Sequence, residues 1–289
     1  MRGSNGGVRM SAKTKPPSPN GAAASREGRP VTVPDFLAAK ARGQRLTMLT
    51  AYDATMARLI DAAGVDSILV GDSLGMVVQG QPDSLAVTVD EMVYHTRLVM
   101  RGVTRSLVVS DMPFMSYHIS PQQALENAGR LIKEGGAHAI KLEGGVRSAP
   151  AVAAITAADI PVVGHVGLTP QSVRRLGGFR VQRDEVRLME DALAVQEAGA
   201  FALVVECVPA EIAQKLTAAL KVPTIGIGAG AGCDGQVLVT HDMLGLYGEF
   251  RPRFVKQYAD LGVALTQAVE EYCREVREGT FPATEHEFR

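Results

Sequence analysis

The hydrophobic residues of this chain fall into short continuous runs, and an amphipathic stretch that ends at glycine precedes several of them. This sequence pattern occurs as LIDAAGVDSILVGD, LIKEGGAHAIKLEGG and AVQEAGAFALVVECV. Its glycines, Gly64, Gly135 and Gly199, stand where a helix C-cap needs a left-handed backbone. Strands that are buried on both faces have such continuously apolar runs. The alternation of helix and strand therefore predicts a parallel sheet covered by helices.

Five further apolar runs bring the predicted strands to eight. Eight strands alternating with helices in a chain of 289 residues favour an α/β fold, the closed (β/α)8 or TIM barrel. An open, doubly wound sheet is the alternative, because periodicity cannot show closure. The short interval before the last run is the weakest part of the pattern, and the amphipathic segment 254–276 is expected to form the closing helix or helices. The five runs are 46–50, 106–112, 161–168, 223–230 and 236–239.

The first 30 residues differ from the rest in composition. They are rich in Gly, Ser, Pro, Ala and basic side chains and contain almost no large apolar residue, which predicts a disordered tail over 1–30. A cloning remnant or an upstream start is an equally good interpretation, because Met10 can begin a shorter chain. Residues 31–289 are expected to form a single catalytic domain.

Charge and cysteine content narrow the function classes. The net charge is -1, with 30 basic and 31 acidic residues, so the charge favours neither nucleic acid nor an anionic membrane as a partner. A small-molecule ligand is expected instead. The three cysteines, Cys207, Cys233 and Cys273, argue against a disulfide framework and against a thiolate metal cluster. No apolar run is long enough to span a membrane or to form a secretory signal, so a cytoplasmic location is expected.

Four predicted strands end in a carboxylate: Asp72, Asp111, Glu143 and Glu206. The active site of a parallel barrel lies at the C-terminal rim, where these side chains are expected to meet. The first three follow consecutive strands, and an all-oxygen set suits Mg²⁺ rather than zinc. A single acidic residue at a strand end is more often a helix N-cap, so the prediction depends on the four together.

Glu206 stands across the barrel, in an expected apolar setting that raises the pKa and suits a general base. Lys141 shares a strand face with Glu143 and can hold a substrate carboxylate, form a Schiff base or act as a plain salt-bridge partner. His165 can contact a ligand or have a structural hydrogen bond. The glycine-rich GIGAGAG departs from both phosphate-loop spacings, and close backbone approach explains it equally well.

Several motifs in order along the chain closely resemble the ketopantoate hydroxymethyltransferase family. They cover about residues 46–258 and include SILVGDSLGMVVQG, VVSDMPFMSY, GGAHAIKLEGG, GHVGLTPQSV, VVECVPAE and PTIGIGAGAGCDGQVLV. The resemblance implies a barrel of the phosphoenolpyruvate/pyruvate superfamily. It also implies transfer of a hydroxymethyl group from 5,10-methylenetetrahydrofolate to 3-methyl-2-oxobutanoate, which gives 2-dehydropantoate (ketopantoate) for pantothenate and coenzyme A.

The resemblance also assigns roles to particular residues. Asp72, Asp111 and Glu143 match the site of one Mg²⁺ per subunit, and Asp72, Ser73, Asp111 and Lys141 match positions that bind the 2-oxo acid. Glu206 matches the proton acceptor. Family members form decamers of pentameric rings. Two rivals stay open: an enzyme that makes or breaks a carbon–carbon bond in another 2-oxo acid without folate, and a catalytically silent barrel that acts as a binding or assembly subunit.

Overall fold

The computed structural model describes residues 28–248 and 252–288. Its eight parallel strands pair in chain order, and β8 pairs back with β1, so the barrel is closed. The expected (β/α)8 barrel is confirmed, and the open sheet is excluded. The predicted tail over 1–30 lies outside the described residues except for 28–30. The strands are β1 (Leu46–Thr50), β2 (Ser67–Val70), β3 (Leu107–Asp111), β4 (Ala139–Glu143), β5 (Val162–Gly167), β6 (Ala202–Glu206), β7 (Thr224–Ile227) and β8 (Gly235–Leu238).

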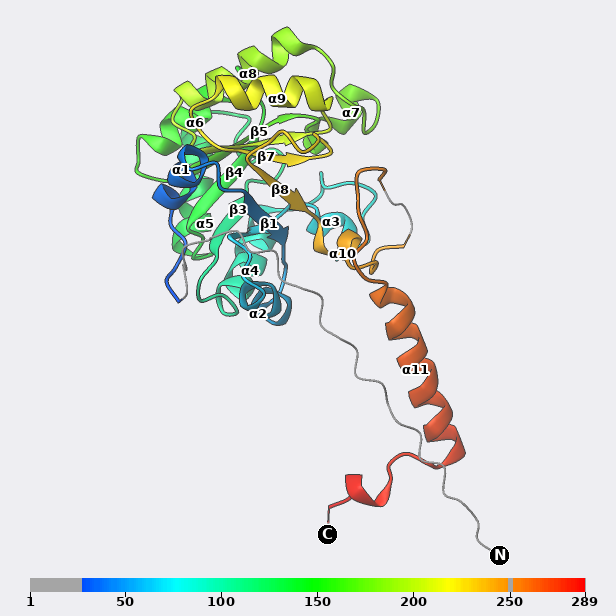
Figure 1. Cartoon of the computed structure of the whole chain (residues 1–289). Helices are drawn as coiled ribbons and strands as arrows, with labels where there is room; N and C mark the ends of the chain where they lie inside the picture. Colours follow the sequence, from blue (N-terminus) through cyan, green and yellow to red (C-terminus); the bar gives the residue numbers. More distant parts are fainter. Residues whose placement is uncertain (1–27, 249–251, 289) are drawn as a thin grey trace, which may run out of the picture.

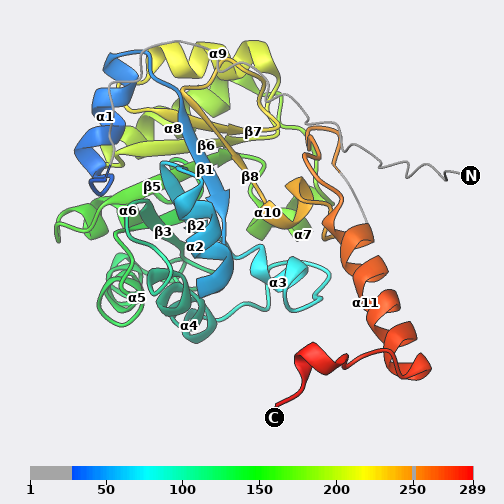
Figure 2. The same ribbon diagram turned by 60° about the horizontal axis from the view of Figure 1, so that its bottom comes forward.

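Helices between the strands surround the barrel (Figures 1 and 2). Several have side-chain N-caps; at α4, the Thr88 hydroxyl accepts a hydrogen bond from the amide of Glu91, whose carboxylate accepts one from the amide of Thr88. The helices are α1 (Val33–Ala41), α2 (Ala54–Ala62), α3 (Leu74–Val77), α4 (Val89–Met100), α5 (Pro121–Lys133), α6 (Ala149–Thr156), α7 (Val173–Leu176), α8 (Glu185–Glu197), α9 (Ala210–Ala219), α10 (Thr240–Met243) and α11 (Leu261–Glu278), with short 3-10 turns at Pro170–Ser172 and Thr284–His286.

Two of the three predicted C-cap glycines are left-handed. Gly64 has φ 90° and Gly199 has φ 103°, as expected for residues that end a helix. The prediction for Gly135 is wrong by one residue, because Gly136 has the positive φ, at 82°. Gly135 is instead needed for close packing, since a Cβ there would lie 2.5 Å from the carbonyl oxygen of Leu131.

Apolar side chains fill the barrel from its N-terminal end upward. Interior residues such as Met48, Val109 and Ile225 form one cluster with residues of α1. Phe36 of α1 packs edge-to-face on Phe201, with ring centroids 5.7 Å apart, and thereby covers the bottom of the barrel. A second, larger cluster lies between the strands and the outer helices. The polar opening is thus left at the C-terminal rim.

The C-terminal helix α11 does not close the barrel, and that prediction is wrong. It extends away from the barrel wall, as the orange ribbon in Figures 1 and 2 shows, and none of its residues is buried. Across residues 28–248 and 252–288, no helix combines the length and apolar character needed to cross a membrane.

Candidate active site

The predicted site residues lie together at the C-terminal end of the barrel. Asp111, Glu143 and Glu206 are the last residues of β3, β4 and β6, and Asp72 and Ser73 follow β2 after Gly71. Asp72, Asp111 and Glu143 are buried, whereas the Glu206 side chain is 15% exposed. The strand ends predicted from the sequence therefore form one site.

The register of the sheet explains which groups become neighbours. Asp111 lies opposite Lys141, and Glu143 lies opposite His165 on the next strand. Because side chains alternate along a strand, Lys141 and Glu143 share the interior face with Ala139, as predicted. The alternation thus places a cation and a carboxylate above the apolar interior.

Asp72 and Asp111 are joined directly. The amide of Asp72 donates to Asp111 Oδ2 at 3.0 Å, and Asp111 Oδ1 forms an ion pair with Lys141 Nζ at 2.7 Å. Gly71 permits this approach, because a Cβ there would lie 2.8 Å from Ser73 Oγ and 3.5 Å from Asp111 Oδ2. Buried charges are stable only when they are paired and hydrogen-bonded, and both conditions hold for Asp111.

Gln171 connects Asp72 to Glu143 and was not predicted. Its Nε2 donates to Asp72 Oδ2 at 2.9 Å and to the carbonyl of Met112, while its backbone amide donates to Glu143 Oε2 at 3.0 Å. The hydroxyl of Tyr117 donates to Gln171 Oε1 at 2.6 Å and accepts from the amide of Glu143 at 3.2 Å. Both residues fall within motifs that carry the family resemblance, GHVGLTPQSV and VVSDMPFMSY, but nothing in their spacing indicates chemistry.

Ser73 lies at the edge of this group. Its hydroxyl is 2.8 Å from the hydroxyl of the buried Tyr52, which comes from the loop after β1. The structure thus places Ser73 beside Asp72, where the resemblance expects a substrate-binding hydroxyl.

His165 links Glu206 to the other charged groups. Its Nε2 is 3.1 Å from Glu206 Oε2, and its Nδ1 is 3.4 Å from Lys141 Nζ and 3.6 Å from Glu143 Oε1. Burial alone would lower the pKa of His165, but the carboxylates of Glu143 and Glu206 outweigh it and raise this pKa to about 9. The apolar setting expected for Glu206 is therefore wrong, because a cationic imidazole adjoins its carboxylate.

The buried carboxylates repel one another. Burial, followed by the charges of Asp111 and Glu143, raises the pKa of Asp72 to about 7. Burial alone would lower the pKa of Lys141, yet Asp111, Glu143 and Asp72 raise it above its ordinary value. A permanently charged amine is a poor nucleophile, so the Schiff-base role is disfavoured and the role of carboxylate partner is favoured.

The charge balance and the donor atoms fit a hard divalent cation. Glu143 Oε1 is a buried carboxylate oxygen without a hydrogen bond, and Asp72, Asp111 and Glu143 are three buried carboxylates close to one buried amine, Lys141. Within residues 28–248 and 252–288, however, no set of three or more His, Cys, Asp or Glu side chains is already arranged around a metal position. Mg²⁺ often binds through one or two carboxylates with water and substrate, which Asp72 and Asp111 can supply, with Glu143 beside them.

Comparison with known proteins identifies the family. The family model described as ketopantoate hydroxymethyltransferase matches residues 30–284. A 3-methyl-2-oxobutanoate hydroxymethyltransferase of Nitratidesulfovibrio vulgaris is 58% identical, covering 96% of this chain and 92% of that protein. One of Moorella thermoacetica is 59% identical, covering 90% and 98%.

Solved structures with the same fold are much more distant in sequence. A phosphonopyruvate hydrolase complex with oxalate and Mg²⁺ superposes with a TM-score of 0.59 at 16% identity, covering 88% of this chain and 93% of that chain. A 2,3-dimethylmalate lyase superposes with a TM-score of 0.57 at 16% identity, covering 89% and 91%. These likenesses show the fold alone, whereas the family match spans nearly the whole chain. The chain therefore belongs to the ketopantoate hydroxymethyltransferase family.

Proposed function

We propose that this hydroxymethyltransferase transfers a hydroxymethyl group from 5,10-methylenetetrahydrofolate to 3-methyl-2-oxobutanoate, giving ketopantoate, through an enolate that Glu206 generates. Family membership supports the reaction class. The position of Glu206 carries the mechanism: its side chain is 15% exposed, against 3% for Asp111 and 2% for Glu143. Of these three carboxylates, it is the one most accessible to a substrate carbon.

The charged groups opposite Glu206 fit a 2-oxo acid. Lys141 Nζ is a buried amine that stays charged. It can bind a substrate carboxylate while it keeps its ion pair with Asp111. The Ser73 hydroxyl lies on the same rim and adds a hydrogen-bond donor. Fixing the acid at these two groups presents its C3 to one face of the site, and such orientation alone contributes several kcal/mol of rate acceleration, on the order of 7.

Glu206 takes the C3 proton, and the electrons of the C–H bond pass into the enolate. The imidazolium of His165 holds the Glu206 carboxylate in place, which keeps the base oriented before and after the transfer. Opening of the folate ring breaks one of the two C–N bonds of the methylene carbon, the freed nitrogen takes a proton equivalent to the one that Glu206 removed, and an iminium is left. The enolate carbon attacks this iminium carbon and forms the new C–C bond. Hydrolysis then breaks the second C–N bond: water supplies the hydroxyl oxygen, and its proton goes to the second folate nitrogen.

Asp72 and Asp111 would hold Mg²⁺, with Glu143 as the third carboxylate of the site. When bound, Mg²⁺ supplies Lewis-acid stabilisation of the negative charge on the keto oxygen. Gln171 keeps the carboxylates of Asp72 and Glu143 at a fixed separation. Lys141 balances the remaining charge of Asp111.

A homo-oligomer, a decamer by family resemblance, is part of the proposal. The helix α11 has exposed apolar residues at Leu265, Val269, Tyr272 and Val276, which are spaced for one helical face. Contact with another copy of the chain would bury this apolar stripe, which its own barrel leaves exposed.

The direct test is formation of ketopantoate by the purified full-length protein from both substrates, after exhaustive chelation and after Mg²⁺ addition. We expect product only with folate and only after Mg²⁺ is restored. Turnover of the 2-oxo acid without folate would favour the rival carbon–carbon bond enzyme. Activity that survives chelation would remove the metal from the mechanism.

A further inference from the structure

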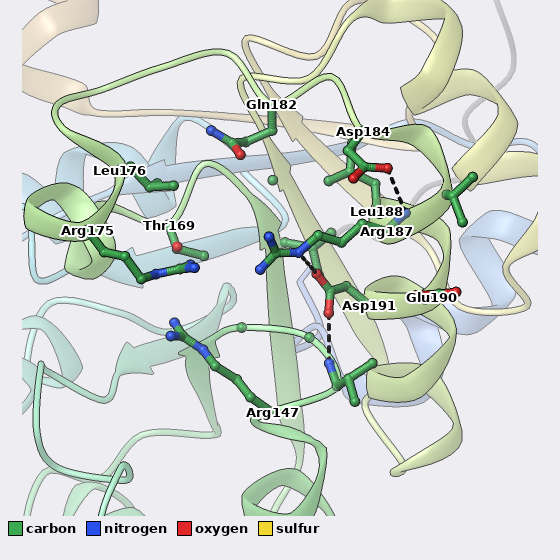
Figure 3. A pocket seen from close by; sticks show the side chains of 16 residues that line it. Arg147, Thr169, Arg175, Leu176, Gln182, Asp184, Arg187, Leu188, Glu190 and Asp191 are labelled. Carbon is green, nitrogen blue, oxygen red and sulfur yellow. Dashed lines mark hydrogen bonds and ion pairs between the residues drawn. The ribbon is translucent and has the colours of Figure 1, made fainter.

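A cavity of about 690 Å³ opens on the rim at the ends of β4 and β5, where Gly144 directly follows Glu143. The loop after β4, the end of β5, the helix α7 and the first turns of α8 line it (Figure 3). Its size suits a drug-sized molecule, since ligand pockets measure roughly 300–1,000 Å³. It is much larger than a five-carbon 2-oxo acid requires.

The inner wall of the cavity is backbone that touches the strand ends of the site. Gly144 donates its amide to the carbonyl of His165 at 2.9 Å, and Leu168 donates to the carbonyl of Glu206 at 2.8 Å. Gly167 has φ 96°, and a Cβ there would lie 2.2 Å from the carbonyl oxygen of Glu206. A molecule in the cavity therefore lies next to the end of β5, whose last residue Gly167 is paired with Glu206, the residue proposed as the base.

Three guanidinium groups, from Arg147, Arg175 and Arg187, point into the cavity from three different elements (Figure 3). Arg187 Nε is 3.7 Å from Asp191 Oδ2, so this arginine has a carboxylate partner. Arg147 donates only to the hydroxyl of Ser172, at 3.0 Å, among the contacts of the described residues. Arg175 has no ion pair with any residue that the structure describes. Two arginines thus remain available to an anionic ligand.

Acidic side chains lie on the other side of the cavity. Figure 3 shows Asp184 and Glu190 on the α8 side, opposite Arg147 and Arg175. Asp184 caps α8 by accepting from the amide of Arg187 at 3.1 Å. Arg147 and Arg175 form a cationic end, whereas on the α8 side Asp184 and Glu190 lie beside the Arg187–Asp191 pair, so an elongated ligand with one anionic terminus has a preferred direction.

We infer that this cavity binds the folate co-substrate, with the carboxylates of its glutamate tail on Arg147 and Arg175. This inference rests on the proposed function. A folate has its two carboxylates at one end and a pterin with N–H donors at the other, which matches the two ends of the cavity. Its one-carbon unit lies between the pterin and the aryl ring, so the middle of the molecule faces Gly144 and Gly167, beside Glu206.

The test measures KM for each substrate separately in Arg147→Ala, Arg175→Ala and the double variant. We expect KM for 5,10-methylenetetrahydrofolate to rise about tenfold in each single variant and about a hundredfold in the double variant, with KM for the 2-oxo acid unchanged. Arg174→Ala is the matched control, because Arg174 pairs with Asp83 at 3.2 Å and does not line the cavity. It should leave both KM values unchanged.

Two further readouts separate a lost subsite from a damaged fold. Exchange of the substrate C3 proton without folate should stay at the parent rate in all three cavity variants. Tetrahydropteroate, which lacks the glutamate carboxylates, should bind the parent and the double variant equally well in a fluorescence titration. Unchanged folate KM in the double variant, or an equal rise in both KM values, would overturn the inference while leaving the proposed function intact. A parent protein that makes no ketopantoate from folate would overturn both.

Discussion

At the scale of single residues, Gln171 sets the spacing of two carboxylates that would otherwise repel each other. Replacing it by leucine keeps the side-chain volume but removes the donor to Asp72. Loss of such a supporting contact typically costs 10–100-fold in metal affinity or activity. We therefore expect kcat/KM of Gln171→Leu to fall about 10–100-fold, together with weaker Mg²⁺ activation.

The exposed Gln81 provides a matched control, because the same substitution there removes an amide from a surface loop. Steady-state kinetics over a Mg²⁺ series compare the two variants. Equal kinetic constants for Gln171→Leu and the parent would show that Gln171 has no part in positioning the carboxylates.

The carboxylates, Lys141 and the barrel rim were predictable, because a strand end at the C-terminal side is a position that the sequence pattern itself defines. Gln171 and Tyr117 were not, since they belong to a 3-10 turn and a long loop whose paths depend on tertiary packing. The environment of Glu206 was predicted wrongly for a related reason. The register that brings His165 next to it depends on how β5 pairs with its neighbours, which no local pattern reveals.

Among the contacts between elements, hydrogen bonds to Asp61 connect the end of α2 to the segment that leads into β3. Its carboxylate accepts four hydrogen bonds of 2.7–2.9 Å from the amides and hydroxyls of Thr104 and Ser106. Burial alone would raise the pKa of Asp61, but these hydrogen bonds outweigh it and lower the pKa to about 2. The ionised form is therefore the one that stabilises this junction.

Because the folded-state pKa lies below the unfolded value, the stabilisation is present above about pH 4 and is lost as the pH falls through 2. We expect Asp61→Asn to lower the free energy of unfolding by about 2 kcal/mol at pH 7. The deficit relative to the parent should narrow by about 1 kcal/mol at pH 3.

Urea unfolding at the two pH values measures this difference, and Asp159→Asn, on an exposed residue, should change stability by less than about 0.5 kcal/mol. A deficit that is the same at both pH values would contradict the assigned role of the charge.

The strands were predictable because buried parallel strands have continuous apolar runs, and α2, α5 and α8 were predictable because glycines follow their ends. The one-residue error at Gly135 shows the limit of this pattern. Of the two adjacent glycines, Gly136 has the left-handed backbone, whereas Gly135 allows close packing. The misplaced α11 shows another. Amphipathicity predicts that a helix has an apolar face, but not whether that face packs on its own barrel or on another molecule.

At the scale of the whole molecule, the exposed stripe of α11 predicts an interface. We expect Leu265→Glu combined with Val269→Glu to lower the particle mass, because two charges would have to be buried in an apolar contact. Gln267→Glu, on the opposite face of the helix, should leave the mass unchanged. Light scattering coupled to size-exclusion chromatography measures all three proteins, and an unchanged mass for the double variant would exclude α11 from the assembly.

In the proposed mechanism, Glu206 removes the C3 proton of the 2-oxo acid. The most direct measurement follows exchange of that proton into deuterated water by NMR, with Mg²⁺ and without folate, in the parent and in Glu206→Gln. This substitution keeps the side-chain shape while removing the basic oxygen, so we expect the exchange rate to fall at least about a hundredfold. Exchange by Glu206→Gln at the parent rate would contradict the assignment of the base.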